Sequence, residues 1–567
     1  MKTMLVGINA RYIHVNAALY SLRASAAAYA KRLDGPAGEL VLREFTVNQG
    51  AEAIYYSILR EQPRAVAFSV YLWNVRLVRD LCRDLRRACP DCLLILGGPE
   101  VSWGTEHAEF AAEDFDYVIE GEGERPFYGL LASLQQPGFR PPEEWRFRIE
   151  GKRVTAAPPE TLDELPFLYE EDDGRFRNRI LYYEASRGCP FSCSYCLSAP
   201  EKGVRLRSLD LVLQELSVLV SRKTPLIKFV DRTFNCSPGR SLAILRWIRQ
   251  LPEEEKTCFH FEIEAGVLTP ELIEELTALP RGRVQAEIGI QSTSARTLEA
   301  CRRNPSLETV FANIRRLTEA GNIRVHVDLI AGLPYESYER FLRSLEEALA
   351  LGAHQLQLGF LKRLQGTPLA AEAERYGYAF SPHPPYEVLR NDFIGPGELR
   401  QLKKIEDVLE RYYNSGRFML FLGELRRQYE NAVALWQELA DFYESRDLIF
   451  ASLGAADTFR AAVDFVWQKE LPEPERRRLL EALLLDYYAF TSADRLPEGL
   501  EELGRRPEGS RETATALLRS VGDRSRRCMV RFLQGRPYIC DYTTRDPVTA
   551  RYPLWPAAGT DETPRFV

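Results

Sequence analysis

The chain has 567 residues, of which 45% are hydrophobic and 27% charged, with a formal net charge of −7. This composition predicts a globular protein of about three to four domains, and nucleic-acid binding is not indicated. No apolar run reaches the roughly eighteen residues that a membrane-spanning helix needs, so we expect no membrane association. The first residues, MKTMLVGINARY, predict a strand and not an export signal. We therefore expect a cytoplasmic protein whose eleven cysteines are reduced thiols.

Residues 1–135 alternate between predicted strands (4–7, 39–44, 65–70, 93–96, 117–119) and predicted helices (17–33, 51–61, 75–89). This alternation predicts a doubly wound, Rossmann-like parallel sheet of the α/β class. Ligands of such sheets bind beyond the carboxyl ends of the strands, which here are rich in glycine and polar residues. The residues that we expect to contact a ligand there are Asn9, Tyr71, Gly97, Gly98, Glu120 and Gly121.

Two further features of the first part of the chain carry no clear chemistry. Cys89 and Cys92 form a C-x2-C pair between a predicted helix and a predicted strand. No second pair accompanies them, so we expect ordinary thiols. Residues 136–180 contain proline and acidic clusters without periodicity, which predicts a linker between domains.

Cys189, Cys193 and Cys196 have the spacing C-x3-C-x2-C in the run RGCPFSCSYC. Three thiolates suit three irons of a [4Fe–4S] cluster and leave the fourth iron open to a small molecule. Structural zinc usually takes four ligands in two knuckles, and no second C-x2-C knuckle follows at a suitable distance. A disulfide would need an oxidising compartment. The spacing therefore favours an iron–sulfur cluster over zinc or a disulfide.

Residues 181–375 alternate again, with predicted strands at 181–185, 226–230, 259–264, 284–290, 325–330 and 355–360. Predicted helices lie between them, for example 209–221, 239–251 and 307–320. Six such repeats predict a partial (β/α)6 barrel, whose working residues lie at the carboxyl ends of the strands. The cysteine loop follows the first of these strands. Single polar residues at the later strand ends are more often caps or solvated side chains.

Residues 376–567 predict a mostly helical domain without a recognisable catalytic motif. Its predicted helices are 386–391, 398–415, 418–445, 456–469 and 473–490, and its predicted strands are 528–533, 538–540 and 552–554. The highly charged segment 505–527 predicts a solvated, partly mobile stretch.

The cysteine run resembles the signature of the radical S-adenosylmethionine (SAM) superfamily. Residues 1–135, with GGPEVS and EGEGE after strands, resemble the cobalamin (B12)-binding domain that precedes many radical SAM domains, and residues 376–567 resemble a domain of unknown function that accompanies them. The cobalamin motif D-x-H-x-x-G is absent, so the resemblance implies cobalamin bound without a histidine on cobalt. We expect His14 to pack or form hydrogen bonds. A flavodoxin-like fold without a cofactor is the alternative for this region.

The strand ends of residues 181–375, taken with the cysteine loop, resemble the SAM site of the oxygen-independent coproporphyrinogen oxidase branch. This resemblance implies that the open iron chelates the amino and carboxylate groups of SAM. It implies that Glu262 and Asp328 contact the ribose and adenosine side, and that Gln291 and Arg303 hold the ribose or the methionine carboxylate. Glu264, two residues after Glu262, competes for the same role.

The function that these resemblances imply is radical methylation of an unactivated carbon. A deoxyadenosyl radical from SAM would abstract a hydrogen from the substrate, and cobalamin would pass on a methyl group from a second SAM. The alternatives are a radical rearrangement or cyclisation without methyl transfer, a tRNA- or peptide-modifying role, and a non-catalytic cobalamin-binding protein. The intact cysteine loop argues against the last. A low-potential electron donor of the flavodoxin or ferredoxin type is implied, whereas catalytic side chains and the substrate are not identified.

Overall fold

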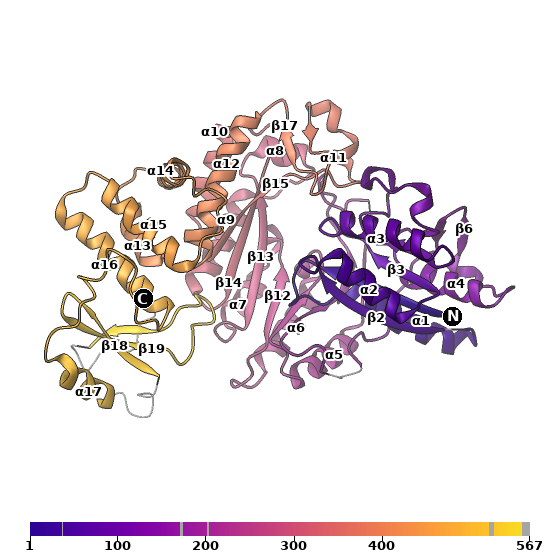
Figure 1. Cartoon of the computed structure of the whole chain (residues 1–567), viewed down its shortest axis with the longest axis horizontal. Coiled ribbons are helices and arrows are strands. Elements are labelled where there is room, and N and C mark those ends of the chain that lie inside the picture. The colour runs from indigo at the N-terminus through magenta and orange to yellow at the C-terminus, as the bar shows by residue number, and fades with distance from the viewer. Residues whose placement is uncertain (37, 171–173, 201–202, 521–526, 558–567) are drawn as a thin grey trace. The chain divides into compact units, whose positions relative to one another are not determined.

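The structure is a computed structural model that describes residues 1–36, 38–170, 174–200, 203–520 and 527–557 (Figure 1). It divides the chain into two compact units. Unit 1 comprises residues 1–267, 300–303 and 361–391, and unit 2 comprises residues 268–299, 304–360 and 392–567. No helix within the described ranges is long and apolar enough to cross a membrane.

Unit 1 begins with a seven-stranded sheet in the order β2-β1-β3-β4-β5-β7-β6, in which only β6 and β7 are antiparallel. Its strands are β1 (Lys2–Asn9), β2 (Glu39–Thr46), β3 (Ala65–Ser69), β4 (Leu93–Gly97), β5 (Tyr117–Ile119), β6 (Arg148–Glu150) and β7 (Arg153–Thr155). The predicted parallel sheet is confirmed. The hairpin β6–β7 adds two strands to it from within the segment predicted as a linker.

Helices cover both faces of this sheet, namely α1 (Ala17–Leu33), α2 (Ala51–Glu61), α3 (Val75–Ala88) and α4 (Glu124–Gln135). Ile58 of α2, Val78 of α3 and Phe68 of β3 lie in one apolar cluster. Successive residues of a strand face opposite sides of the sheet, so the residue before Phe68 faces the other side. On the other face, α1 packs against α4. There Ala67 and Ile95 point away from the apolar cluster and line a cavity.

The rest of unit 1 holds three parallel strands, a hairpin and a carboxyl-terminal segment. The parallel strands pair as β8–β11 and β11–β12. The elements are β8 (Ile180–Tyr183), β9 (Ser186–Gly188), β10 (Val204–Leu206), α5 (Leu209–Ser221), β11 (Leu226–Phe229), α6 (Pro238–Arg249), β12 (Cys258–Glu262), α11 (Pro368–Ala371), β16 (Ala379–Phe380) and β17 (Val388–Arg390). The antiparallel hairpin β9–β10 encloses the cysteine loop.

Unit 2 begins with α7 (Pro270–Thr277) and contains the parallel strands β13 (Val284–Gln291), β14 (Arg324–Ala331) and β15 (Gln355–Phe360). The helices α8 (Ala295–Ala300), α9 (Leu307–Ala320) and α10 (Tyr338–Leu349) connect or follow them. The six strands predicted for residues 181–375 are therefore present, three in each unit, which confirms the strand–helix repeats.

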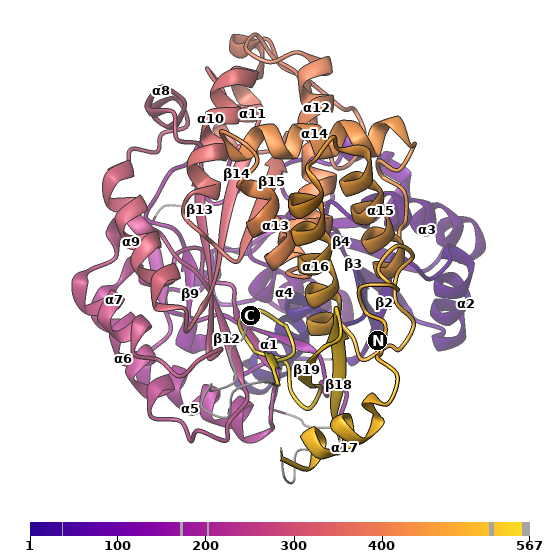
Figure 2. The same ribbon diagram turned by 90° about the vertical axis from the view of Figure 1, so that its left-hand side faces the viewer.

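The carboxyl-terminal part of unit 2 is mostly helical, as predicted. Its elements are α12 (Pro396–Leu409), a π-helical turn (Glu410–Asn414), α13 (Met419–Arg426), α14 (Ala432–Ser445), α15 (Ala455–Gln468), α16 (Glu473–Phe490), α17 (Ser510–Ser520) and the antiparallel strands β18 (Cys528–Leu533), β19 (Arg536–Asp541) and β20 (Leu554–Pro556). Figures 1 and 2 show α13, α15 and α16 side by side.

Three predictions for this region change. The predicted helix at 386–391 is wrong, because β17 pairs with β16 there and six residues are too few to hold an isolated helix. The predicted helix 418–445 is two helices, since Asn431 accepts a hydrogen bond from the Ala434 N–H (2.8 Å) and begins α14. The segment 505–527 contains α17, and residues 521–526 of that prediction lie outside the described residues.

Candidate functional site

A cavity of ≈ 680 Å³ opens at the carboxyl ends of β3, β4 and β5, and we call it the rim cavity. Five residues that the sequence predicts as ligand contacts line it: Tyr71, Gly97, Gly98, Glu120 and Gly121. The small side chains of Ala67 and Ser69 leave space above the sheet. Gly98 has φ +113, and a Cβ there would lie 2.5 Å from the Val70 carbonyl oxygen, so only glycine fits.

Asn9 and His14 do not line the rim cavity. The Asn9 amide donates to the His14 carbonyl (3.0 Å) and to the Glu44 carboxylate (2.9 Å). His14 Nδ1 lies 2.7 Å from the Tyr182 hydroxyl, and burial lowers the pKa of the imidazole. The predicted hydrogen-bonding role of His14 agrees with these contacts. Among its described lining residues, the rim cavity has no histidine.

The rim cavity is also lined by residues that sequence reasoning missed. Leu197 and Ser198 follow Cys196 directly, so the cysteine loop forms part of the wall. Trp103, half exposed, lies over Gly366, where a Cβ would be 2.3 Å from the indole ring. Arg232, just after β11, contributes a guanidinium for which no ion pair or side-chain hydrogen bond is found within the described ranges.

The cysteine loop is held by contacts at each thiol. Cys189 Sγ lies 3.5 Å from the Thr233 hydroxyl, and Cys196 Sγ accepts from the Ser198 N–H (3.5 Å). Cys193 Sγ accepts from Arg303 Nη1 (3.8 Å). Burial raises the pKa of the Cys193 thiol, and Arg303 opposes this shift. Gly188 has φ +96, and a Cβ there would be 2.3 Å from the Gly203 carbonyl oxygen, so the entry to the loop requires glycine.

The donor set of this loop fits an iron–sulfur cluster chemically. Three thiols lie on an irregular loop of eight residues, Cys189–Cys196, and a buried guanidinium next to one of them favours thiolate. Within the part of the chain that the structure describes, no three Cys, His, Asp or Glu side chains lie in an arrangement that would hold a metal ion. The three sulfurs therefore share a loop without converging on one point.

Arg303 is paired with Glu264, the competitor of Glu262. Its Nη2 lies 2.5 Å from Glu264 Oε2, and both side chains are largely buried. Burial opposes the charge, but Tyr195, Glu264 and Cys193 together raise the pKa of Arg303. Asn235 exchanges hydrogen bonds with the Glu264 backbone (2.9 and 3.0 Å). Glu262 is half-buried at the end of β12, and Glu264 lies two residues beyond that end.

Gln291 and Asp328 lie on neighbouring strands of unit 2. Gln291 ends β13 with φ +69, and its side chain folds over Gly289, where a Cβ would be 2.0 Å from Gln291 Nε2. Asp328 of β14 is the register partner of Gly289, and His326 Nε2 lies 3.2 Å from its carboxylate. Gln291 Oε1 is buried and accepts no hydrogen bond from any described residue. The strand end thus presents an acceptor for a bound molecule.

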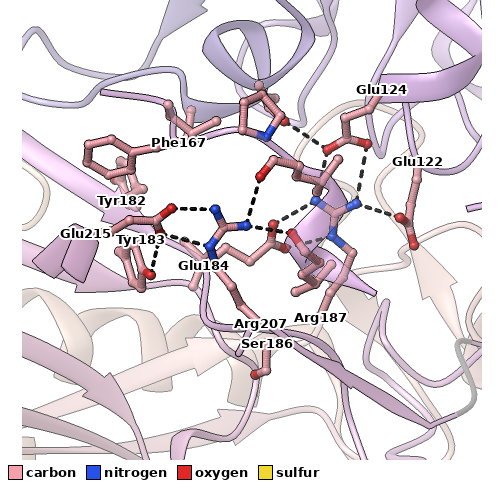
Figure 3. Close-up of a pocket in the computed structure, with 18 of the residues that line it drawn as sticks. Glu122, Glu124, Phe167, Tyr182, Tyr183, Glu184, Ser186, Arg187, Arg207 and Glu215 are labelled. Carbon is pink, nitrogen blue, oxygen red and sulfur yellow. Dashed lines mark hydrogen bonds and ion pairs between the residues drawn. The ribbon is translucent and has the colours of Figure 1, made fainter. Parts of the chain in front are cut away.

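A second cavity of ≈ 370 Å³, the hairpin cavity, lies among α1, β8 and β9 (Figure 3). Arg187 of β9 binds three carboxylates there: Glu122 (2.6 Å), Glu124 (2.9 Å) and Glu184 (2.7 Å). Burial lowers the pKa of Arg187, but the Glu124 and Glu184 carboxylates outweigh this effect and raise it. In the same view, Arg207 pairs with Glu215.

The EGEGE run therefore does more than line a rim. Glu122 and Glu124 line both cavities and connect the first sheet to the strand that enters the cysteine loop. Glu120 pairs with Arg153 (2.6 Å). The three carboxylates of the rim cavity are each paired with an arginine, although Arg187 is shared by Glu122 and Glu124, and Arg232 adds one further positive charge. Arg232 is therefore the group of the rim cavity that suits an anionic partner.

Three family models match successive parts of the chain. The B12 binding domain matches residues 5–131, the Radical SAM superfamily matches residues 183–348, and a protein family of unknown function (DUF4080) matches residues 374–525.

Curated relatives include methyltransferases. The chain is 27% identical over 324 residues to a 2-(S-pantetheinyl)-carbapenam-3-carboxylate methyltransferase of Streptantibioticus cattleyicolor, covering 52% of this chain and 46% of the relative. It is 26% identical over 341 residues to the cobalamin-dependent radical SAM methyltransferase TokK of Streptomyces tokunonensis, covering 56% and 50%. The chain thus spans about half the length of the curated relatives it matches.

Solved structures share the fold. The cobalamin-dependent S-adenosylmethionine radical enzyme OxsB, with aqua-cobalamin and SAM bound, matches with a TM-score of 0.55 at 14% identity, covering 86% of this chain and 84% of that chain. The methyltransferase TsrM from Kitasatospora setae, with cobalamin and a [4Fe-4S] cluster bound, matches with a TM-score of 0.52 at 16% identity, covering 68% and 79%.

Proposed function

We propose that the chain is a cobalamin-dependent radical methyltransferase acting on an unactivated carbon, and its matches to the B12 binding domain and to the Radical SAM superfamily support this proposal. Methyltransferases of this kind among its relatives support the proposal. The observation that carries it is the rim cavity. One cavity is lined both by the strand ends of the first sheet and by the two residues that follow Cys196.

The residues that would hold the iron–sulfur cluster are Cys189, Cys193 and Cys196. Soft thiolates select iron–sulfur chemistry, and three of them leave one iron open for SAM. Arg303 contacts Cys193 and Glu264, so it lies beside the cluster loop with its charge retained.

The residues that would hold SAM are Gln291, Arg303 and Asp328, with Glu264 and Glu262 at the end of β12. The guanidinium of Arg303 suits a carboxylate, and the buried Gln291 Oε1 suits an amino or hydroxyl donor. The Asp328 carboxylate suits the ribose hydroxyls, because carboxylate oxygens accept hydrogen bonds from hydroxyl groups.

The residues that would hold cobalamin line the rim cavity: Tyr71, Gly97, Gly98, Glu120 and Gly121. The plane of Tyr71 is fixed by stacking on Trp73, with 4.4 Å between ring centroids. The described lining of the rim cavity offers no histidine that would bind cobalt. Arg232 would bind an anionic group of the substrate at the side of the cavity next to the cysteine loop.

When bound, the cluster with SAM supplies a carbon-centred radical and cobalamin carries the methyl group. The chain's own residues then have two tasks. Trp103 and Tyr71 would contact the bound molecules with their aromatic rings, and the arginines paired with Glu120 and Glu124 would hold these carboxylates in place. A low-potential donor of the flavodoxin or ferredoxin type would supply electrons, and we propose a cytoplasmic location.

The test is anaerobic incubation of the reduced holoprotein with methyl-labelled SAM and a small-molecule extract of the host. A methyltransferase is expected to place the label on a product and to form both S-adenosylhomocysteine and 5′-deoxyadenosine. Steady 5′-deoxyadenosine without transferred label would contradict methylation and favour a rearrangement or cyclisation. Absence of SAM cleavage would leave a cobalamin-binding protein.

A further inference from the structure

Unit 2 contains a third cavity of ≈ 480 Å³, which we call the α13 cavity. It lies among the end of α10, the π-helical turn, α13 and α14. Arg324 begins β14 and His354 precedes β15, so the cavity is at the amino ends of these strands. The working end of such strands is the carboxyl end, where Gln291 closes β13. The α13 cavity is therefore separate from the site described above.

One wall of the cavity is a second face of α13. Met419, Leu422, Gly423 and Arg426 line it at the helical spacing i, i+3, i+4 and i+7. The buried residues Phe421 and Leu425 do not line the cavity, and α13 packs against α16. Met419 remains 46% exposed, so this apolar face has no complete cover within the described residues.

Another part of the cavity lining is aromatic and held in place by hydrogen bonds. Tyr412 and Tyr413 come from the π-helical turn, a feature that often marks functional sites. The Tyr413 hydroxyl donates to the Ala353 carbonyl, and the Tyr412 hydroxyl lies 3.0 Å from that of Tyr443. Asn414 anchors the turn by two hydrogen bonds to the Leu356 backbone (2.8 and 2.9 Å). With Trp436 of α14, these rings form a rigid apolar wall.

The polar groups of the cavity favour an acceptor or an anion. The Glu346 carboxylate is used by the N–H groups of Ala432 (3.0 Å) and Val433 (2.9 Å) and by Arg426 (3.6 Å). His354 Nδ1 accepts from the Val325 N–H (3.1 Å), which leaves Nε2–H as a donor. Burial lowers the pKa of His354 to about 4, so the ring is neutral at pH 7. Arg426 Nη1 donates to the Tyr429 carbonyl oxygen (2.6 Å), and its Nη2 faces Glu346, so the guanidinium is held at the cavity wall.

We propose that the α13 cavity binds a planar, apolar small molecule that carries one carboxylate or similar acidic group at its edge. Its volume lies within the roughly 300–1,000 Å³ of ordinary small-molecule sites. The aromatic wall contacts the planar body, and Arg426 with the His354 donor contacts the acidic edge. This site does not depend on the proposed function, because none of its residues takes part in that chemistry.

The test uses three isosteric probes with the full chain: 2-naphthoate, 2-naphthylmethanol and 2-naphthylmethylammonium, measured by equilibrium dialysis at neutral pH. The carboxylate is expected to saturate one site per chain and to bind about tenfold tighter than the ammonium, a difference of about 1.4 kcal/mol. Arg426→Gln is expected to weaken the binding of 2-naphthoate several-fold and to leave the binding of 2-naphthylmethanol unchanged.

Gly423→Leu fills the cavity, since a Cβ at Gly423 has no atom within 4 Å and Leu raises helix propensity. This substitution is expected to weaken the binding of 2-naphthoate at least tenfold. Gly397→Leu is the matched control, because Gly397 of α12 has an equally open Cβ position and does not line the cavity. Equal binding of the three probes, no saturable binding, or unchanged binding in Gly423→Leu would overturn the proposal.

Discussion

Arg187 Nη2 lies 2.9 Å from Glu124 Oε1, and this ion pair joins the start of α4 to β9, two residues before Cys189. Glu124 is buried, yet Arg187 and the Ser21 hydroxyl outweigh that burial and lower the pKa of its carboxyl. The contact ties the part of the chain that lines the rim cavity to the entrance of the cysteine loop. The position of that loop therefore depends on Glu122 and Glu124, which follow β5.

Arg187→Met should destabilise this region, because it leaves Glu122, Glu124 and Glu184 without their shared cation. Breaking a buried pair by removing one partner costs about 3–5 kcal/mol. Hydrogen–deuterium exchange should become faster in β9 and the cysteine loop, and iron retention should fall. The control is Arg153→Met, which breaks the exposed pair with Glu120 and should leave exchange in β9 unchanged. Equal behaviour of the two variants would contradict the account.

Gly97→Leu should weaken cobalamin binding strongly and spare the cluster. A Cβ at Gly97 has Ile119 as its nearest neighbour, at 3.7 Å, so the backbone accepts a side chain that then occupies the rim cavity. Cobalt retention should fall by about tenfold or more, equivalent to about 1.4 kcal/mol, with iron unchanged. Gly239→Leu on α6, whose Cβ position is open, should retain both metals. Full cobalt retention in Gly97→Leu would place cobalamin elsewhere.

Asp231 should titrate near neutral pH. Its carboxylate is buried and accepts from the Ser186 hydroxyl (2.6 Å) and the Ala185 N–H (2.9 Å), and burial raises its pKa to about 6. The unfolded value is about 3.9, so the folded chain binds more protons between about pH 4 and 6. Its contribution to stability is therefore present below about pH 4, falls as pH rises to about 6, and amounts to at most about 3 kcal/mol.

The measurement is the infrared difference between the wild-type apoprotein and Asp231→Asn. A carboxylic acid C=O band should be present at pH 5, disappear with a midpoint near pH 6, and be missing in the variant. A difference spectrum without any titration between pH 5 and 7 would show that Asp231 ionises at its ordinary pKa.

Gly366→Ala should distort the rim cavity. Gly366 has φ +80, and the new Cβ would lie 2.3 Å from the Trp103 ring, so the methyl group is both strained and in collision. The loop that carries Trp103 should move and cobalamin should bind several-fold more weakly in a visible-absorbance titration. Adding Trp103→Gly should restore part of the affinity by removing the collision. No change in Gly366→Ala would mean that Trp103 does not shape the cavity.

Sequence patterns predicted the elements well where periodicity was strong. The apolar spacing of α3 and the glycines after β4 led to the sheet and to five of the residues that line its cavity. Asn9 has the same strand-end position, but its amide is used by Glu44, a contact between distant segments that no local pattern contains. The sequence could not predict that Glu122 and Glu124 bind Arg187, because that arginine lies 63 or more positions away from them.

The same limit explains the choice between Glu262 and Glu264. Two residues on one strand share a face, so the sequence could not separate them. In the structure β12 ends at Glu262. Beyond this end, the Asn235 side chain accepts a hydrogen bond from the Glu264 N–H, and the Glu264 carboxylate binds Arg303. For 386–391, pairing with β16 overrode the helical spacing.

The most direct test of the account is the metal content of the anaerobically purified chain supplied with iron, sulfide and cobalamin. Wild type should hold about four irons and about one cobalt per chain. A variant with Cys189, Cys193 and Cys196 all changed to Ala should lose the iron and keep the cobalt, because no cysteine lines the described part of the rim cavity. Iron without cobalt in wild type would contradict cobalamin binding at the rim cavity, and retained iron in the triple variant would contradict the cysteine loop as the cluster site.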